Sequence, residues 1–222
     1  APFSDPNIDL AQYHSRRASI LSTRKFFSGD VSVEDASDPY VRAILTVIMP
    51  KPPTSELFIR FSSTLFESLI DHGGNVSGAV TTMITARAGK DLVSSLSAGL
   101  LSIGPRFGGA VNAAAAMWRE GVMGSGTPAL FVESKNKQGK LIQGIGHRKY
   151  RVGIPDPRVA TLSQFIDSLE SHPHYDFARA VEALTTAKNG SLILNVDGAI
   201  AAIALDILKE KEGYTNEELD SL

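Results

Sequence analysis

Apolar side chains in the middle of the chain recur at intervals that predict helices. The clearest set is spaced by four residues and comprises Leu57, Phe61, Leu65 and Leu69. Side chains at this spacing lie along one face of a helix. Gly73 and Gly74 then interrupt the pattern, because glycine is a poor helix former, and they leave His72 in the last turn. We therefore expect a helix that ends near residue 72.

The same periodicity returns several times after residue 89. It runs over 89–103 through Leu92, Leu96 and Leu100, over 157–170 through Val159, Leu162, Phe165 and Leu169, then through Phe177, Val181 and Leu184, and through Ile200, Ile203 and Ile207. The alanine-rich stretch 108–121 also favours a helix, and we place its Trp118 in the core. "SLILNV" (191–196) has the character of a short buried strand, but no second strand is available to pair with it. The pattern predicts an all-α fold with short glycine or proline turns.

The first 53 residues follow a different pattern. They are rich in Ser, Asp and Pro and carry one apolar run, 41–49, which Pro50 ends. We expect a poorly defined N-terminal segment with one buried element and a stiff linker, followed by a helical domain over residues 54–222.

The last residues resemble the beginning of a helix. Thr215 and Glu218 have the spacing of a capping box, and Leu219 and Leu222 begin an apolar face. We therefore expect the domain to be incomplete at its C-terminus.

Composition excludes several classes of protein. The chain has 222 residues, 43% of them apolar, and a net charge of −2, which argues against an extended nucleic-acid surface. It has no cysteine, so a disulfide scaffold and a thiolate metal site are excluded. No signal peptide and no apolar run long enough to span a bilayer is found, so we expect a cytoplasmic protein without a membrane partner.

Three motifs set a titratable residue beside glycine near a predicted helix boundary. They are "DHGGNVSGA" (71–79), "GIGHRKYRVGIPDPR" (144–158) and "LNVDG" (194–198). Helix ends leave backbone N–H and C=O groups available to ligands. Two histidines, an aspartate and nearby arginines, without a metal-binding set, suit acid–base chemistry on a small anionic substrate, such as aldol or retro-aldol chemistry.

Structural interpretations of these residues stay open at this point. His72 alone is more simply a helix cap, and Asp197 beside Gly198 is commonly a turn. For His147 a functional and a structural role are equally well supported. The pair His172 and His174 has no third ligand, and we expect both on the surface rather than at a metal.

The three motifs together resemble the citrate synthase superfamily, and most closely the citryl-CoA lyase module of ATP-citrate lyases. The stretches that carry the resemblance run in the family's order from about 70 to 205: "DHGGNVSGAV", "ARAGKDLVSSLSAGLLSIGPRFGGAVNAAA", "GKLIQGIGHR", "PDPRV" and "LILNVDG". The resemblance implies a large helical domain and a smaller one that closes over coenzyme A. It also implies a dimer or tetramer, and a ligase module similar to succinyl-CoA synthetase as partner.

The resemblance also implies roles for single residues. His72 would bind the oxaloacetate-derived part of the substrate at its oxygen, and His147 would exchange a proton with the tertiary hydroxyl. Arg158 would hold a citrate carboxylate. Asp197 would protonate the enolate carbon of acetyl-CoA as the C–C bond breaks. The coenzyme A site would be formed by Leu141, Ile142, Gly144, Ile145, Gly146 and Lys188, with no metal and no redox cofactor.

One position separates the lyase from the synthase. Citrate synthases carry a histidine in a Gly-Pro-Leu-His-Gly motif, whereas the matching stretch here, "GPRFGG", has Phe107. Phenylalanine donates no hydrogen bond, and loss of one oxyanion donor costs about two to three orders of magnitude in rate. We therefore expect a lyase that splits citryl-CoA into acetyl-CoA and oxaloacetate. The alternatives are a non-catalytic oligomerisation core and, less favoured, a citrate synthase.

Overall fold

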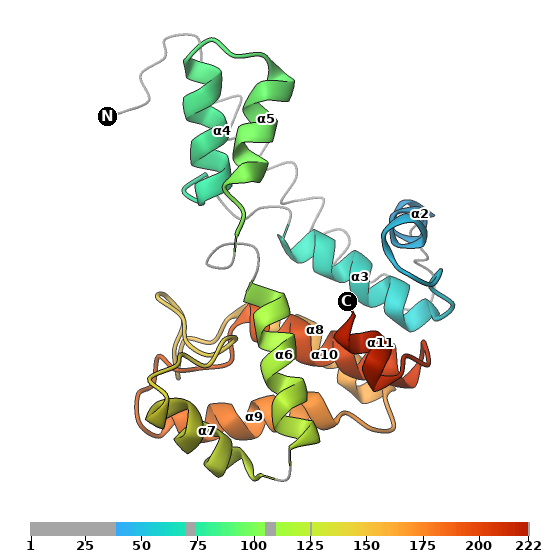
Figure 1. The fold of residues 1–222 in the computed structure, drawn as a ribbon, viewed down its shortest axis with the longest axis vertical. Coiled ribbons are helices and arrows are strands. Elements are labelled where there is room, and N and C mark those ends of the chain that lie inside the picture. The colour runs from blue at the N-terminus through green and yellow to red at the C-terminus, as the bar shows by residue number, and fades with distance from the viewer. Residues whose placement is uncertain (1–38, 70–73, 105–109, 125, 222) are drawn as a thin grey trace. The chain divides into compact units, whose positions relative to one another are not determined.

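A computed structural model describes residues 39–69, 74–104, 110–124 and 126–221. Over these residues it holds ten α-helices, one 3₁₀ helix and no strand (Figure 1). The elements are α2 (Pro39–Ile48), α3 (Glu56–Leu69), α4 (Ser77–Arg87), α5 (Leu92–Leu101), α6 (Ala110–Met123), α7 (Pro128–Lys137), α8 (Pro157–Ser163), η1 (Gln164–Ser168), α9 (Pro173–Thr186), α10 (Val196–Glu210) and α11 (Asn216–Asp220). The predicted all-α fold is confirmed.

Helix α10 is the centre of the packed core. Eleven of its fifteen residues are buried, and it packs against α6, α9, α8 and α3. Ala199 and Ala202 are fully buried, and their small side chains let the neighbouring helices approach closely. Trp118 of α6 is also fully buried, as the sequence predicts.

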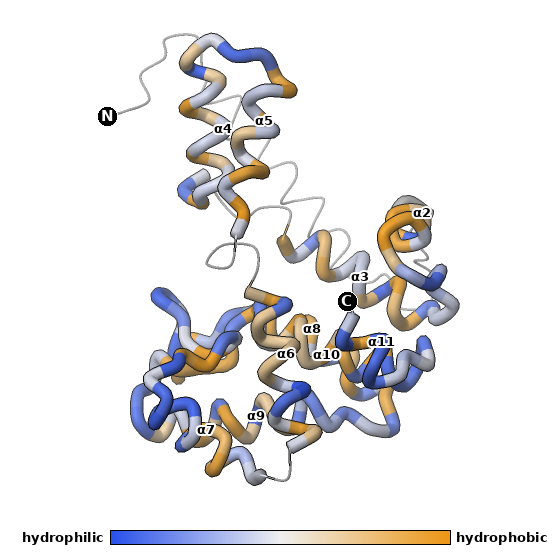
Figure 2. Tube along the Cα trace, viewed as in Figure 1, coloured by the Kyte–Doolittle hydropathy of each residue, from blue (hydrophilic) through white to orange (hydrophobic). Residues whose placement is uncertain are grey.

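Helices α4 and α5 form a hairpin in which they pack closely on each other. A Cβ added at Gly99 would lie only 2.1 Å from Thr82 Oγ1, so glycine is required for this approach. Asp91 caps the start of α5 by accepting the N–H of Ser94 at 3.0 Å. The predicted apolar set on α5 does not become core within the described residues. Leu92, Leu96 and Leu100 are 81%, 54% and 57% exposed. Figure 2 shows apolar positions at intervals along α5.

Helices α2 and α3 pack on each other, and the residues just before α3 contact the C-terminal part of the chain. The apolar run at 41–49 forms α2, with Val41 and Leu45 buried. Before α3, Glu212 accepts the N–H groups of Thr54 (2.9 Å) and Ser55 (2.8 Å). The predicted capping box is present, because Thr215 and Glu218 hydrogen bond reciprocally at the start of α11.

The region 157–174 differs from the predicted pattern in two ways. The single helix expected over 157–170 is instead α8 followed by the tighter turns of η1, a common ending for an α-helix. The surface position expected for His174 is wrong, because its exposed fraction is 2%. Asp206 of α10 accepts the His174 backbone N–H at 3.1 Å and lies 2.6 Å from its Nδ1, so the buried ring is paired.

Candidate active site

Two of the three motifs meet in the structure as neighbouring backbone segments. The GIGH turn (144–147) lies antiparallel to the segment 191–195, with an isolated bridge between Ile145 and Leu194. Three backbone hydrogen bonds join them: Gly146 N to Ile193 O (2.7 Å), His147 N to Ser191 O (3.1 Å) and Asn195 N to Gly144 O (2.9 Å). The apolar stretch 191–196 therefore does pair, although its partner is a turn that periodicity cannot identify as a strand.

Glycine at positions 144 and 198 permits the closest contact in this junction. Gly144 has φ +85°, and a Cβ there would lie 2.7 Å from Gly198 Cα and 3.0 Å from the Trp118 ring. A Cβ at Gly198 would lie 2.4 Å from Gly144 O. The Trp118 indole N–H donates to Gly198 O at 3.0 Å. The family resemblance assigns Gly144 to the coenzyme A site, and the structure adds an internal reason for glycine there, which is the contact with α10.

His147 is held in one tautomer by the turn that follows it. Its Nδ1 accepts the backbone N–H groups of Lys149 (2.9 Å) and Tyr150 (3.0 Å). In the neutral ring the proton is therefore on Nε2. Burial lowers the pKa of His147, and the positive charges of Arg158 and Lys149 act in the same direction.

Carboxylates close to His147 oppose that shift without reversing it. The charges of Asp156 and Asp197 both raise the pKa of the imidazole, but the net direction is downward. At neutral pH the ring is consequently uncharged and presents an N–H donor at Nε2.

Arg158 and Asp156 form a two-point ion pair at the start of α8. The Arg158 Nε donates to Asp156 Oδ1 at 3.0 Å and Nη2 donates to Oδ2 at 2.7 Å. Burial acts to raise the pKa of Asp156, but hydrogen bonds from the side chain and backbone of Arg158 hold it below its ordinary value. Asp156 also caps α8 by accepting the Arg158 N–H at 3.0 Å. Asp156 therefore occupies the Nε–Nη2 edge of the Arg158 guanidinium.

Asp197 lies in the first turn of α10 and is half-buried. Asn195 caps this helix by accepting the Gly198 N–H at 3.0 Å, and its Nδ2 donates to Gly146 O at 3.0 Å. The Asp197 charge acts on both His147 and Arg158. Three of the predicted site residues, which come from two separate motifs, therefore share one electrostatic environment.

The predicted coenzyme A residues border the same junction. Leu141 is 81% exposed, Ile142, Ile145 and Gly146 are half-buried, and Gly144 is buried. Lys188 is exposed just after α9. The turn that follows it contacts the 147–153 loop, because Val152 N donates to Gly190 O at 2.8 Å.

His72 and Phe107, which the sequence analysis also singled out, lie outside the described residues. Asp156, Tyr150 and Asn195 have roles in the structure that the sequence did not predict. A signal was available for Asp156, because an aspartate before a proline is typical of a helix N-cap followed by its first residue.

The chain is similar in sequence to one family of proteins over most of its length. The sequence profile of the family "Citrate synthase, C-terminal domain" matches residues 8–215. The chain belongs to the citrate synthase family. Family members with similar sequences include the ATP-citrate synthases of Mus musculus and Schizosaccharomyces pombe (the latter described as a probable subunit 1), at 50% identity over 151 residues and 46% over 160. These matches cover 68% and 72% of this chain but 14% and 26% of those proteins.

Solved structures of the family have a similar fold. ATP citrate lyase from Methanothrix soehngenii, in complex with citrate and coenzyme A, superposes with a TM-score of 0.77 at 38% identity, covering 82% of this chain and 29% of that one. A citryl-CoA lyase from Hydrogenobacter thermophilus gives a TM-score of 0.68 at 32% identity, covering 81% of this chain and 67% of that one.

The described residues contain neither a membrane-spanning helix nor a group of side chains suited to a metal ion. None of their helices combines the length and apolar character needed to cross a membrane. Among the same residues, no three histidine, aspartate or glutamate side chains are grouped so that they could bind a metal ion.

Proposed function

We propose that this chain carries a citryl-CoA lyase site that cleaves citryl-CoA into acetyl-CoA and oxaloacetate. The observation that carries the proposal is the junction of the GIGH turn with the start of α10, which places His147, Arg158 and Asp197 in one environment. Relatives support the substrate class. One of the similar ATP citrate lyase structures, from Methanosaeta concilii, is an Asp-to-Ala variant in complex with (3S)-citryl-CoA.

The cleavage is a retro-aldol reaction. The hydroxyl gives its proton to the Asp197 carboxylate and becomes the ketone of oxaloacetate as the bond between the carbinol carbon and the thioester CH₂ breaks, and the electron pair of that bond moves to the thioester enolate. A proton from Asp197 then converts the enolate carbon into the methyl group of acetyl-CoA.

The fixed tautomer defines what His147 contributes. Its Nε2–H donates a hydrogen bond to the substrate oxygen and stabilises the negative charge that develops there. Proton exchange through Nδ1, the broader role expected from the sequence, would require breaking both backbone hydrogen bonds from Lys149 and Tyr150. Hydrogen-bond donation is therefore the better supported role.

The remaining predicted residues bind rather than react. Arg158 holds a substrate carboxylate from the side that Asp156 leaves open, and His72 is assigned to the same oxygen as His147. The 141–146 backbone and Lys188 bind the coenzyme A portion. The substrate would come from a ligase module that joins citrate to coenzyme A with ATP.

The test is oxaloacetate release from citryl-CoA by the 222-residue chain, followed with coupled malate dehydrogenase. Replacing Asp197 with asparagine removes the proton donor at nearly constant volume, so the rate should fall at least about 100-fold. Asp167→Asn, an exposed aspartate in η1, is the matched control and should keep full activity. A normal rate in Asp197→Asn would contradict the mechanism.

A second proposal concerns assembly. Helix α5 exposes apolar residues along its length within the described structure, including Leu92 (81%), Val93 (73%) and Leu101 (87%). A continuous exposed apolar face of this kind suits a protein interface. We assign it to a contact with a second copy of the chain. A folded chain that assembles but releases no oxaloacetate would support the alternative of an oligomerisation core.

A further inference from the structure

The segment 191–195 has a second edge, which faces helix α9. Along an extended segment, successive residues direct their backbone groups to opposite sides. Residues 191, 193 and 195 bond to the GIGH turn. On the other side, Leu194 N donates to Glu182 Oε1 at 2.9 Å, and Leu192 O accepts from Thr185 Oγ1 at 2.7 Å. Two side chains of α9 therefore take the place of a neighbouring strand.

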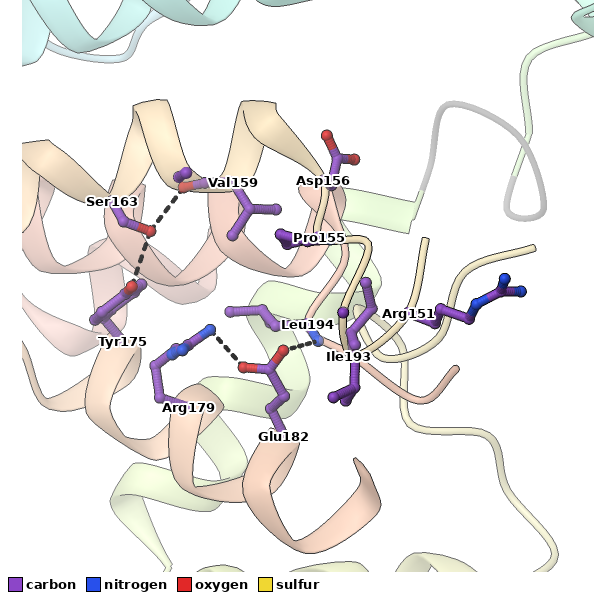
Figure 3. A pocket seen from close by; sticks show the side chains of 13 residues that line it. Arg151, Pro155, Asp156, Val159, Ser163, Tyr175, Arg179, Glu182, Ile193 and Leu194 are labelled. Carbon is purple, nitrogen blue, oxygen red and sulfur yellow. Dashed lines mark hydrogen bonds and ion pairs between the residues drawn. The ribbon is translucent and has the colours of Figure 1, made fainter. Parts of the chain in front are cut away.

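Glu182 is itself held in position. Arg179, one turn earlier on α9, lies with Nη1 2.5 Å from Glu182 Oε2, and the Glu182 side chain is only 15% exposed. Figure 3 shows the resulting chain from Arg179 through Glu182 to the Leu194 backbone. These groups lie in the wall of a cavity of about 370 Å³ between α8 and α9.

This outer edge determines the register, which is the alignment of segment 191–195 against the GIGH turn. A slip of one residue in an extended segment turns every side chain to the opposite side. Leu194 pairs with Ile145, which is two residues before His147, and it lies three residues before Asp197. Fixing the Leu194 N–H therefore fixes the separation of the two proposed reacting side chains.

We propose that Glu182, assisted by Thr185, is a positioning residue that sets the register of segment 191–195 against the GIGH turn. It contacts no reacting atom and acts through the Leu194 and Leu192 backbone. The inference rests on the proposed lyase function for its kinetic consequence, but not for its structural one.

The kinetic test compares two substitutions of Glu182. Glu182→Ala removes the acceptor and should lower kcat for citryl-CoA about 10- to 100-fold, because small misplacements of reacting groups have effects of this size. KM should change less than about twofold, because uniform binding contacts are retained. Glu182→Gln keeps a carbonyl oxygen for the Leu194 N–H and should stay within about threefold of the unsubstituted kcat.

A second measurement does not depend on activity. Trp118 is the only tryptophan, and its ring contacts the Gly144–Gly198 junction. Its fluorescence emission and acrylamide quenching therefore report on the position of the GIGH turn. Both should change in Glu182→Ala and remain as in the unsubstituted chain in Glu182→Gln.

Two further variants distinguish an effect on the register from an effect of lost charge and from a failure to fold. Glu133→Ala removes an exposed carboxylate that pairs with Lys137 on α7, and it should change neither measurement. Thr185→Val removes the hydroxyl that donates to Leu192 O at 2.7 Å, along with its longer 3.1 Å contacts to Val181 O and Glu182 O within α9, at nearly constant volume. It therefore gives a second reading if Glu182→Ala fails to fold. It should lower kcat several-fold and change the Trp118 emission.

The outcomes separate the two proposals. Unchanged kcat and unchanged Trp118 emission in a folded Glu182→Ala or Thr185→Val variant would overturn the positioning role. Equal damage from Glu182→Gln and Glu182→Ala would also overturn it, because the ion pair rather than the Leu194 bond would then matter. If the unsubstituted chain cleaves no citryl-CoA, the lyase proposal fails, and the Trp118 measurements alone decide the register proposal.

Discussion

His147 derives its tautomer from the turn that follows it and its pKa from burial and the neighbouring charges. Two backbone N–H groups converge on Nδ1, so the turn selects the tautomer before any substrate arrives. Burial, with the charges of Arg158 and Lys149, lowers the pKa of the ring by more than the charges of Asp156 and Asp197 raise it. A neutral donor at neutral pH is the result, and it suits stabilisation of a developing oxyanion.

The lowered pKa predicts how His147 affects stability. A histidine that titrates lower in the folded than in the unfolded chain destabilises the folded state as pH falls below the unfolded value of about 6.5. The contribution of His147 to the free energy of unfolding should be fully present above that pH and decrease as pH falls toward the folded pKa. We expect ¹⁵N-edited NMR to detect an Nε2–H ring that titrates below 6.5. An Nδ1–H ring, or titration above 6.5, would contradict the assignment.

Helix α10 joins the core to the site. Its middle is buried against four helices, while its first turn carries Asp197 and touches the GIGH turn through Gly198. Because the same rigid helix forms both contacts, packing in the core fixes the position of the carboxylate. Asn195 strengthens this link by capping α10 and donating to Gly146 O at the same time.

Gly198→Ala tests the contact between α10 and the turn. Alanine favours a helix over glycine by about 1 kcal/mol, so propensity alone predicts stabilisation. The added Cβ would lie 2.4 Å from Gly144 O, however, and the turn must move. We expect a net loss of about 1–3 kcal/mol in the free energy of unfolding, measured with urea.

Gly126→Ala is the control for this substitution. A Cβ there meets only Leu130 Cβ at 3.8 Å, an ordinary contact. Its free energy of unfolding should stay within about 0.5 kcal/mol of the unsubstituted chain. A Gly198→Ala chain as stable as this control would show that the turn yields freely.

The α4–α5 hairpin matters at the scale of the whole molecule. Its two helices are closely packed on each other, yet α5 keeps its leucines exposed within the described residues. Burial of these leucines against a second copy of the chain would remove apolar surface from water, and each Å² buried stabilises the assembly by about 25 cal/mol. Assembly of the chain is therefore the expected use of this face.

Leu96→Glu tests the proposed interface. Leu96 is 54% exposed on α5, and a buried glutamate in its place would oppose association. Sedimentation velocity should show a dimer or tetramer for the unsubstituted chain and a shift toward monomer for the variant. Leu130→Glu on α7, where the leucine is 57% exposed, should leave the assembly unchanged. An unsubstituted chain that sediments only as monomer would refute the assignment.

Several features of the site could be read from the sequence because their cause is local. The capping box at Thr215 and the helix starts near Pro157 and Val196 depend on neighbouring residues alone. The motifs around His147 and Asp197 also identified the family, which the profile match confirms. The burial of His174 was missed because its partner, Asp206, lies 32 residues away.

The all-α class, the family and several of the helices follow from the sequence, since periodicity, caps and motifs act over a few residues, whereas α4 and α7 were not predicted. Which backbone segments touch became known from the folded structure. The contact between Gly144 and Gly198, the tautomer of His147 and the support of Leu194 by Glu182 each depend on groups brought together by folding. The cause is the range of the interactions. The spacing of residues along the chain fixes which face of a helix a side chain occupies, but the packing of whole helices determines its partners across the core.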